Sequence, residues 1–249
     1  MEEKIKKELQ QIEKEYSIKI LYSCESGSRA WGFPSPVSDY DVRFIYTRAL
    51  NDYLTVCPEK DQLSFPINDE IDLYGWDISK VLRLIVKSNT TPFEWLQSPV
   101  IYRENKEFKE KLWQLSQSYF CQRSNIHHYL GVARGAMDTI EGEEIRIKKL
   151  FYVLRPLLAA LWCAERKTIA PMNIHPLMGL FSDNLRKKVL SLIELKTSVV
   201  EGYAVKIDEH LKEWIDQTTC YCLEVSQKID RKTFDTKKAD LFFRKIIQK

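Results

Sequence analysis

Long apolar runs are missing from this sequence. No stretch approaches the roughly 20 consecutive apolar residues that a membrane-spanning helix needs. Residues 1–7 are mostly charged and lack the apolar core of a secretion signal. A strong charge of one sign is missing too, because the net charge is only +3 and does not by itself indicate nucleic-acid binding. We therefore expect a cytoplasmic protein with no membrane partner.

Cysteine pairs of the kind that bind metals are also missing. The 6 cysteines form no Cys-x-x-Cys motif, and no histidine lies at zinc-ligand spacing from them. Cys220 and Cys222 come closest to a motif, but a helical segment explains their spacing better than a metal or redox site does. The sequence therefore predicts neither a zinc centre nor a redox pair.

What is present is the composition of a globular protein. Hydrophobic residues make up 44% of the 249 positions and charged residues 29%, which excludes a disordered chain. A chain of this length has room for a real core, in one large domain or two small ones. Aromatic residues, at 12%, suit both a packed core and a base-stacking surface, so they do not decide between these roles.

The first part of the chain alternates between helical and strand patterns. Apolar residues recur at helical spacing near the N-terminus, and Asp77 and Thr91 are placed to cap later helices. Gly75 is expected to end a strand. The predicted elements are helix 2–16, strand 17–24, a short helix at 28–32, strand 39–47, a short helix and loop within 49–69, strand 70–74, helix 78–88, a short helix at 93–97 and an edge strand at 99–102.

The second part of the chain is predicted to be entirely helical. Its helices are expected at 105–117, 120–140, 143–165, 173–196, 207–227 and 233–247. We therefore predict an α+β protein, with a small mixed sheet packed against helices and followed by a helical domain. The predicted domains are a catalytic domain at 1–104 and a helical domain at 105–249.

The stretch 25–46 contains the strongest functional signal. Gly27 and Ser28 form a turn whose backbone N–H groups can hold phosphates, because glycine permits a close approach to a ligand. Asp39 and Asp41 follow in the pattern Asp-x-Asp, and residues two apart on a strand point to the same face. Two carboxylates on one face suit Mg²⁺, which binds a few carboxylates together with substrate phosphates.

A third carboxylate is expected from a neighbouring strand. Asp72 lies between two apolar residues of the predicted strand 70–74, where an unpaired charge would be costly. It should therefore meet a metal or a positive partner. Arg43 shares the face of Asp41 and is expected to neutralise it, whereas Arg29 follows the turn and is a candidate phosphate ligand.

These residues resemble a known superfamily. The Gly-Ser turn, the Asp-x-Asp pair and the later aspartate are similar to the nucleotidyltransferase superfamily that includes DNA polymerase beta. The phrases that begin at Gly27 and Ser38 look like one subgroup of predicted bacterial and phage nucleotidyltransferases, named for its association with RNA ligase. The other phrases that look like this subgroup are Asp72–Asp77, Ser88-Asn89, Glu94–Ser98, Tyr102, His128–Arg134 and Lys148–Pro156.

The resemblance implies a fold and a chemistry. It implies a polymerase beta-like catalytic core and transfer of a nucleotide, with Asp39, Asp41 and Asp72 as catalytic residues and ligands of Mg²⁺ (or Mn²⁺). The third acidic residue of the superfamily binds the second metal and activates the attacking hydroxyl. The acceptor of this subgroup does not follow from the resemblance.

One face of a predicted helix in the second part is a candidate nucleotide-binding surface. Lys148, Tyr152 and Arg155 are spaced to lie on one side of the helix, and Lys149 is adjacent. Basic groups with a tyrosine can contact phosphates and a base or ribose. A solvated face with ion pairs explains the same pattern, so both interpretations stay open.

The leading hypothesis is a metal-dependent nucleotidyltransferase that moves NMP from an NTP to a hydroxyl acceptor. An RNA end, a protein side chain and a small molecule are the candidate acceptors. A second hypothesis is a helical ribonuclease, because Arg123 and His128 fit an Arg-x4-His spacing, although so short a pattern arises often by chance. A third is a nucleotide- or RNA-binding module without catalysis.

Overall fold

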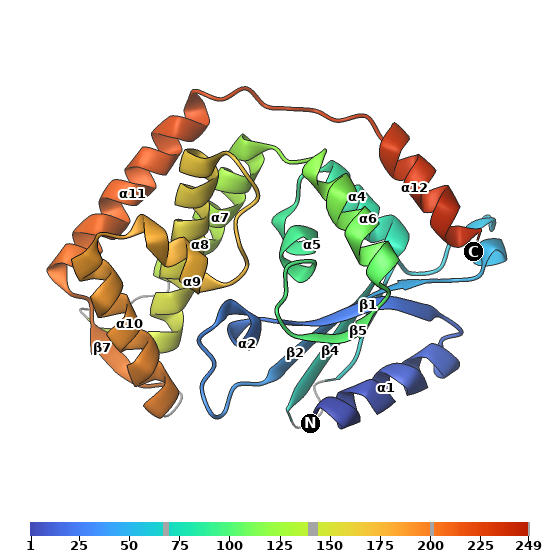
Figure 1. Ribbon diagram of the computed structural model, residues 1–249, viewed down its shortest axis with the longest axis horizontal. Coiled ribbons are helices and arrows are strands. Elements are labelled where there is room, and N and C mark those ends of the chain that lie inside the picture. The colour runs from blue at the N-terminus through green and yellow to red at the C-terminus, as the bar shows by residue number, and fades with distance from the viewer. Residues whose placement is uncertain (67–69, 139–143, 200–201, 249) are drawn as a thin grey trace. The chain divides into compact units, whose positions relative to one another are not determined.

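The chain divides into two compact units (Figure 1). The computed structural model describes residues 1–66, 70–138, 144–199 and 202–248. The sheet unit comprises Met1–Ala30, Asp39–Tyr119 and Thr233–Lys249, and the helical unit comprises Trp31–Ser38 and Phe120–Lys232. The α+β class predicted from the sequence is confirmed, because one unit is built on a mixed sheet and the other mostly on helices.

The sheet unit holds most of the strands. Its elements are α1 (Glu2–Glu15), β1 (Lys19–Ser26), α2 (Ser28–Trp31, whose last residue belongs to the helical unit), β2 (Tyr40–Thr47), α3 (Leu50–Tyr53), β3 (Gln62–Ser64), β4 (Ile71–Asp77), α4 (Ile78–Val86), α5 (Thr90–Trp95), β5 (Ile101–Glu104), α6 (Lys106–Gln117) and α12 (Lys237–Ile247).

The five-stranded sheet has the strand order β3-β4-β2-β1-β5. Strands β2 and β4 run parallel, and the other neighbouring pairs run antiparallel. Figure 1 shows α1 on one face of the sheet and α4 and α5 on the other. Apolar residues of α1 such as Ile5 and Leu9 share a core with Val42 and Phe44 of β2, while Ile78 and Phe93 are fully buried on the helices of the opposite face. Burial on both faces fixes the register of the strands that carry the polar site.

The last helix returns to the sheet unit. The backbone N–H of Ala239 in α12 donates a hydrogen bond to the hydroxyl of Tyr119 (3.2 Å). Phe242 and Phe243 of α12 contact Phe108 and Tyr53, with ring centroids 6.1 and 5.2 Å apart. The compact units therefore do not coincide with the predicted division at residue 104, which stays a prediction about domains.

The predicted end of strand β4, at residue 74, is wrong. Gly75 does not break the strand, which continues to Asp77. A Cβ atom on Gly75 would lie 2.1 Å from the Phe44 ring on the neighbouring strand. Glycine is therefore needed there for close packing between β2 and β4, and not for a turn.

Other boundaries also differ from the sequence predictions. The N-cap of α5 is Asn89, whose side chain accepts from the N–H of Thr91 (2.9 Å), so Thr91 lies inside the helix. Asp39 precedes β2 instead of starting it. The three-residue strands were not predicted from the sequence, because three residues are too few to show an alternation of apolar and polar side chains. Parts of the predicted loop 49–69 and helices 120–140 and 143–165 fall on 67–69, 139–140 and 143, outside the described residues.

The predicted cap at Asp77 is confirmed. Its carboxylate accepts from the N–H of Ser79 and from the hydroxyl of Tyr53, both at 2.8 Å, and the residue is buried. Replacing Asp77 by alanine is expected to lower the free energy of unfolding by about 2 kcal/mol, because a cap and a buried partner are both lost. Urea denaturation measures this loss. Ser182→Ala is the control, because Ser182 caps α10 without a side-chain hydrogen bond, and an equal loss in both variants would contradict the account.

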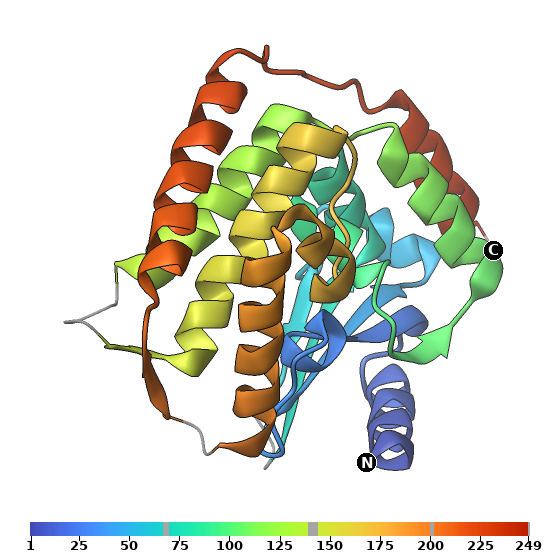
Figure 2. The same cartoon turned by 60° about the vertical axis from the view of Figure 1, so that its left-hand side comes forward.

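The helical unit packs its longest helices side by side. Helices α7, α8 and α11 contact one another and lie together in Figure 2. Phe33, from the segment between α2 and β2, is buried in the same core. The elements of this unit are α7 (Gln122–Met137), β6 (Glu144–Arg146), α8 (Ile147–Arg166), α9 (Ile174–Leu177), a 3-10 turn (Met178–Leu180), α10 (Asp183–Ser198), β7 (Ala204–Lys206) and α11 (Glu209–Gln227).

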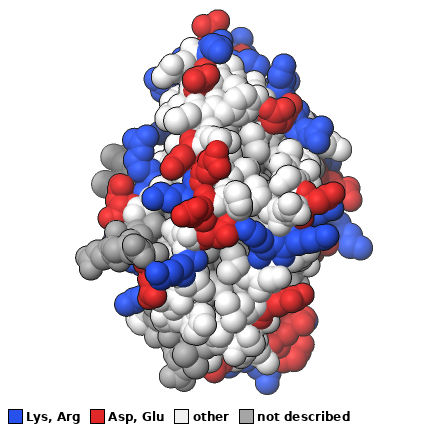
Figure 3. All heavy atoms as spheres, turned by 90° about the vertical axis from the view of Figure 1, so that its left-hand side faces the viewer, with Lys and Arg blue, Asp and Glu red and all other residues white. Residues whose placement is uncertain are grey.

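Lysine and arginine side chains lie among aspartate and glutamate side chains on the face in Figure 3, in keeping with the small net charge. In the part of the chain that the structure describes, no helix is both long and apolar enough to cross a membrane.

Candidate active site

Two of the predicted carboxylates lie side by side on the sheet. Asp41 of β2 and Asp72 of β4, here called the acid pair, are direct partners in the register of these parallel strands. Their side chains are 32% and 33% exposed, so both can meet a ligand while resting on a rigid support. The sequence prediction that Asp72 comes from a strand next to Asp41 is confirmed by this register.

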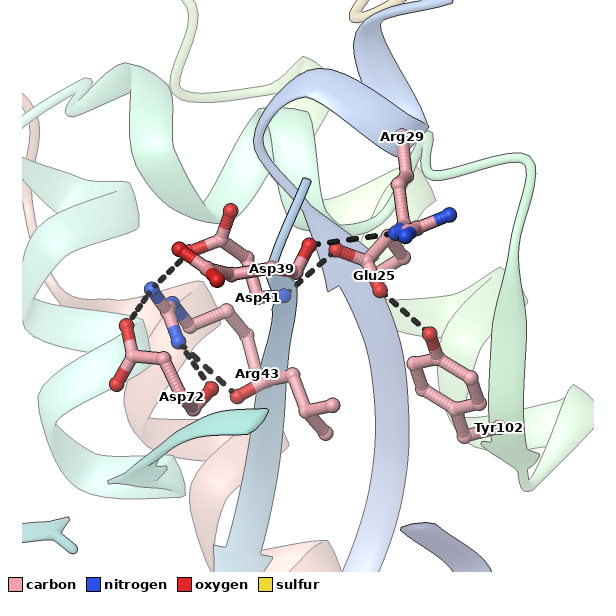
Figure 4. A network of polar contacts seen from close by, with 8 residues as sticks. Glu25, Arg29, Asp39, Asp41, Arg43, Asp72 and Tyr102 are labelled. Atoms are coloured by element: carbon pink, nitrogen blue, oxygen red, sulfur yellow. Dashed lines mark hydrogen bonds and ion pairs between the residues drawn. The ribbon is translucent and has the colours of Figure 1, made fainter. Parts of the chain in front are cut away.

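One cation joins the two carboxylates. The Nη2 of Arg43 lies 3.1 Å from Oδ1 of Asp41 and 2.7 Å from Oδ2 of Asp72 (Figure 4). Its Nη1 donates to the backbone carbonyls of Asp72 (2.8 Å) and Val42 (3.2 Å). The side chain is only 17% exposed. Arg43 therefore neutralises Asp41, as the sequence predicted, and it neutralises Asp72 as well.

The Gly-Ser turn meets Asp41 directly. Ser26 pairs with Asp41 across β1 and β2, and Gly27 follows with φ at +74°. A Cβ atom at Gly27 would lie 2.1 Å from Oδ2 of Asp41. Any residue other than glycine would therefore have to move the carboxylate. L side chains also rarely adopt a φ of +74°, so the backbone conformation favours glycine as well. The turn and the acid pair thus form one structural unit.

Asp39 and Arg29 lie beside this pair. Asp39 is exposed just before β2, and its backbone carbonyl accepts from Nε of Arg29 at 3.3 Å. The guanidinium of Arg29 also lies 3.9 Å from the ring centroid of Tyr40. Within the described ranges, no three acidic, cysteine or histidine side chains are grouped so that they could hold a metal. The structure brings Asp41 and Asp72 together. Since no third such group joins them among the described residues, the metal role of Asp39 stays a prediction.

Glu25 is a site residue that the sequence analysis missed. It is fully buried at the end of β1. Its Oε1 accepts from the backbone N–H of Asp41 at 2.8 Å, and its Oε2 accepts from the hydroxyl of Tyr102 (Figure 4). Burial raises the pKa of Glu25 to about 7, with the nearby Asp41 carboxylate adding to the rise. The available signal was a carboxylate directly after an apolar strand, where burial is costly unless the group has partners.

The raised pKa of Glu25 predicts a pH dependence of stability. Because its pKa in the folded protein is about 7 and its ordinary value is 4.5, the folded state holds more protons between these values. Stability should therefore fall as pH rises through this window, by up to about 3 kcal/mol from this group. Glu25→Gln should remove that slope. Urea unfolding in EDTA on both sides of the window measures it, and equal slopes in wild type and variant would contradict the assignment.

Comparisons with known proteins identify the family of this chain. A family model described as "RlaP: RNA repair pathway DNA polymerase beta family" matches residues 1–245. The chain belongs to the RlaP family. It is therefore a member of a polymerase beta-like nucleotidyltransferase family associated with RNA repair.

Two individual proteins are similar to this RlaP family member. It is 43% identical over 199 residues to "Uncharacterized protein YcgL" of Bacillus subtilis (strain 168), covering 79% of this chain and 76% of that protein. A solved nucleotidyltransferase-like protein from Exiguobacterium sibiricum 255-15 is 11% identical, with a TM-score of 0.33, and the match covers 90% of this chain and 74% of that one.

Two phrases that resemble the RNA-ligase-associated subgroup meet in the helical unit. Trp31, inside the phrase that begins at Gly27, lies under the guanidinium of Arg155, 4.7 Å from the ring centroid. The ring of Tyr152 meets Trp31 edge-on at 5.2 Å. Arg155 is only 4% exposed, and its Nε donates to the carbonyl of Met172 at 3.1 Å. The geometry thus gives Tyr152 and Arg155 a packing role, and the predicted nucleotide contacts of Lys148, Lys149, Tyr152 and Arg155 stay predictions.

Phe33, two residues after Trp31, is buried in the core of the helical unit. Its ring stacks on Phe151 of α8 at 4.7 Å. The ammonium of Lys196 in α10, a buried lysine, donates to the carbonyl of Phe33 at 2.7 Å. Residues 31–38 therefore belong to the helical unit, although both neighbouring segments of the chain belong to the sheet unit.

The ribonuclease hypothesis gains no support from the structure. Arg123 and His128 are five positions apart on α7, which places them about 140° apart around a helix. The Nη1 of Arg123 donates to the carbonyl of Ile229 at 3.0 Å, and the ring of His128 meets that of Tyr129 edge-on at 5.7 Å. These contacts are those of a packed helix, and they do not converge on one catalytic point.

Proposed function

We infer that this RlaP family member is a metal-dependent nucleotidyltransferase that moves NMP from an NTP to a hydroxyl of an RNA end. The observation that carries the proposal is the pair Asp41 and Asp72, set side by side on parallel strands and bonded to one cation beside the Gly27 turn. The family's association with RNA repair favours RNA over the protein and small-molecule acceptors.

The residues of this site fit a divalent cation. The Nη2 of Arg43 is a positive group within bonding distance of both carboxylates, so it marks a position where a cation is held. Asp41 and Asp72 would hold Mg²⁺ or Mn²⁺ through hard oxygen ligands, with Asp39 as the third candidate. When bound, the metal would neutralise phosphate charge and make the attacking hydroxyl more acidic.

The proposed reaction is an in-line displacement at the α-phosphate. The acceptor hydroxyl loses its proton to water and its oxygen forms a bond to the α-phosphorus, while the bond from the α-phosphorus to the oxygen that bridges to the β-phosphate breaks and pyrophosphate leaves. The backbone of the turn at Gly27 and Ser28 would hold the phosphates, with Arg29 nearby. Asp41 and Asp72 would fix the position of the reacting groups, because both rest on the sheet and not on a mobile loop.

An incorporation assay tests this proposal. Each α-labelled NTP is incubated with the protein, Mg²⁺ or Mn²⁺, and separate pools of RNA, protein and small molecules. We expect label in RNA that carries a free 3′ hydroxyl and none in RNA whose 3′ end has been oxidised. Label confined to protein or small molecules would reject the RNA acceptor. Label no greater than with an Asp41→Asn/Asp72→Asn double variant, in every pool, would reject the transferase.

A further inference from the structure

The acid pair already contains a cation of its own. A single nitrogen, Nη2 of Arg43, contacts Asp41 at 3.1 Å and Asp72 at 2.7 Å. Two like charges that are direct partners on neighbouring strands repel each other, so the pair needs a positive group to be stable. Arg43 supplies that group.

A metal and Arg43 would compete for the same carboxylate oxygens. Asp41 and Asp72 would hold a divalent ion through carboxylate oxygens, and an ion held through the two oxygens that now contact Nη2 would leave this nitrogen without its ionic partners. It would also bring a second positive charge close to the guanidinium. The opposite nitrogen, Nη1, keeps its bonds to the carbonyls of Asp72 and Val42, which do not involve the carboxylates. Arg43 can therefore remain attached to the strands while Nη2 is displaced.

We propose that Arg43 is the resident cation of the Asp41–Asp72 pair, and that a divalent metal must displace its Nη2 in order to bind. This inference rests on the proposed function, because it takes these aspartates as the metal ligands. It gives Arg43 a positioning role: the residue stabilises the metal-free site and lowers the affinity of that site for metal. The site is thereby kept ordered when no metal is bound.

The inference predicts opposite effects of one substitution on stability and on metal affinity. Arg43→Gln keeps an amide donor for the carbonyls but removes the charge. The variant should bind Mn²⁺ about ten- to a hundredfold more tightly than wild type, because the metal no longer has to break charge-assisted hydrogen bonds. In EDTA it should melt at a lower temperature than wild type, and Mn²⁺ should raise its melting temperature by more than it raises that of wild type.

Arg103→Gln is the matched control. Arg103 of β5 forms an ion pair with Glu13 of α1, away from the acid pair. Its loss should change stability without changing the affinity for Mn²⁺. Binding is measured by isothermal titration with Mn²⁺ alone, so the readout does not depend on activity.

Three results separate the possible outcomes. Tighter Mn²⁺ binding by Arg43→Gln, with unchanged binding by Arg103→Gln, supports the inference. Binding by Arg43→Gln that equals or falls below that of wild type overturns the inference and leaves the proposed function standing. Folded wild type and variant that both fail to bind Mn²⁺ overturn the inference and the metal-dependent function together.

Discussion

Replacing Asp41 or Asp72 by asparagine is expected to lower kcat for nucleotidyl transfer by roughly three orders of magnitude or more, because a lost metal ligand removes several kcal/mol of transition-state stabilisation. Both carboxylates rest on strands that are buried on either side, so the change should act on chemistry more than on folding. Single-turnover rates with saturating Mg²⁺ and labelled NTP measure the effect. Circular dichroism and the melting temperature establish that the variants are folded.

The matched control for this prediction is Asp61→Asn. Asp61 also contacts cations, namely Arg83 and, at 3.9 Å, Lys80. Its side chain is 40% exposed, and it does not contact the acid pair. An exposed ion pair contributes little, so the turnover rate should hardly change. If Asp61→Asn lost as much activity as Asp41→Asn, or if Asp72→Asn retained most of its activity, the acid pair would not be the catalytic centre.

The second large effect is expected at the turn. Gly27→Ala should lower activity by roughly a hundredfold, because a Cβ atom there displaces the Asp41 carboxylate, and a displacement of about 1 Å in a catalytic group has consequences of this size. The positive φ of +74° adds strain, so the free energy of unfolding should fall by about 1–3 kcal/mol. Steady-state kinetics and urea unfolding on the same preparation measure the two effects.

Gly131→Ala is the control for the glycine substitution. Gly131 lies inside α7, and apart from its chain neighbours and the backbone of the helix itself, no atom lies within 4 Å of the position its Cβ would take. Alanine in a helix interior is expected to raise stability by about 1 kcal/mol and to leave activity unchanged. An active Gly27→Ala protein would show that the turn tolerates a side chain, and the close approach to Asp41 would then have no catalytic meaning.

The sequence predicted the acid pair because strand periodicity is local. Asp41 was placed by alternation along its own strand, and Asp72 by the cost of a charge among apolar neighbours. Glu25 has the same kind of signal, but its partners lie 16 and 77 positions away, at Asp41 and Tyr102. No local pattern reveals that a backbone N–H and a tyrosine hydroxyl both point at its carboxylate.

The features that escaped prediction depend on packing between distant segments. Glycine is a residue type typical of turns, yet Gly75 lies within a strand, where the absence of a side chain leaves room for the ring of Phe44 on the next strand. The return of α12 to the sheet unit depends on contacts such as that between Ala239 and Tyr119, which are 120 positions apart. Arg155 fits the pattern of an exposed basic face, but Trp31 and Met172 bury it. In each case the deciding partner is absent from the local sequence window.

The most direct test of the site is a crystal structure of the protein with Mn²⁺ and a non-hydrolysable NTP analogue. The anomalous signal of manganese locates the metal independently of any activity. We expect a peak in contact with the carboxylates of Asp41 and Asp72, phosphates of the analogue at the Gly27 turn, and Nη2 of Arg43 displaced from both aspartates. A metal bound elsewhere, with Arg43 still joining Asp41 to Asp72, would contradict the account.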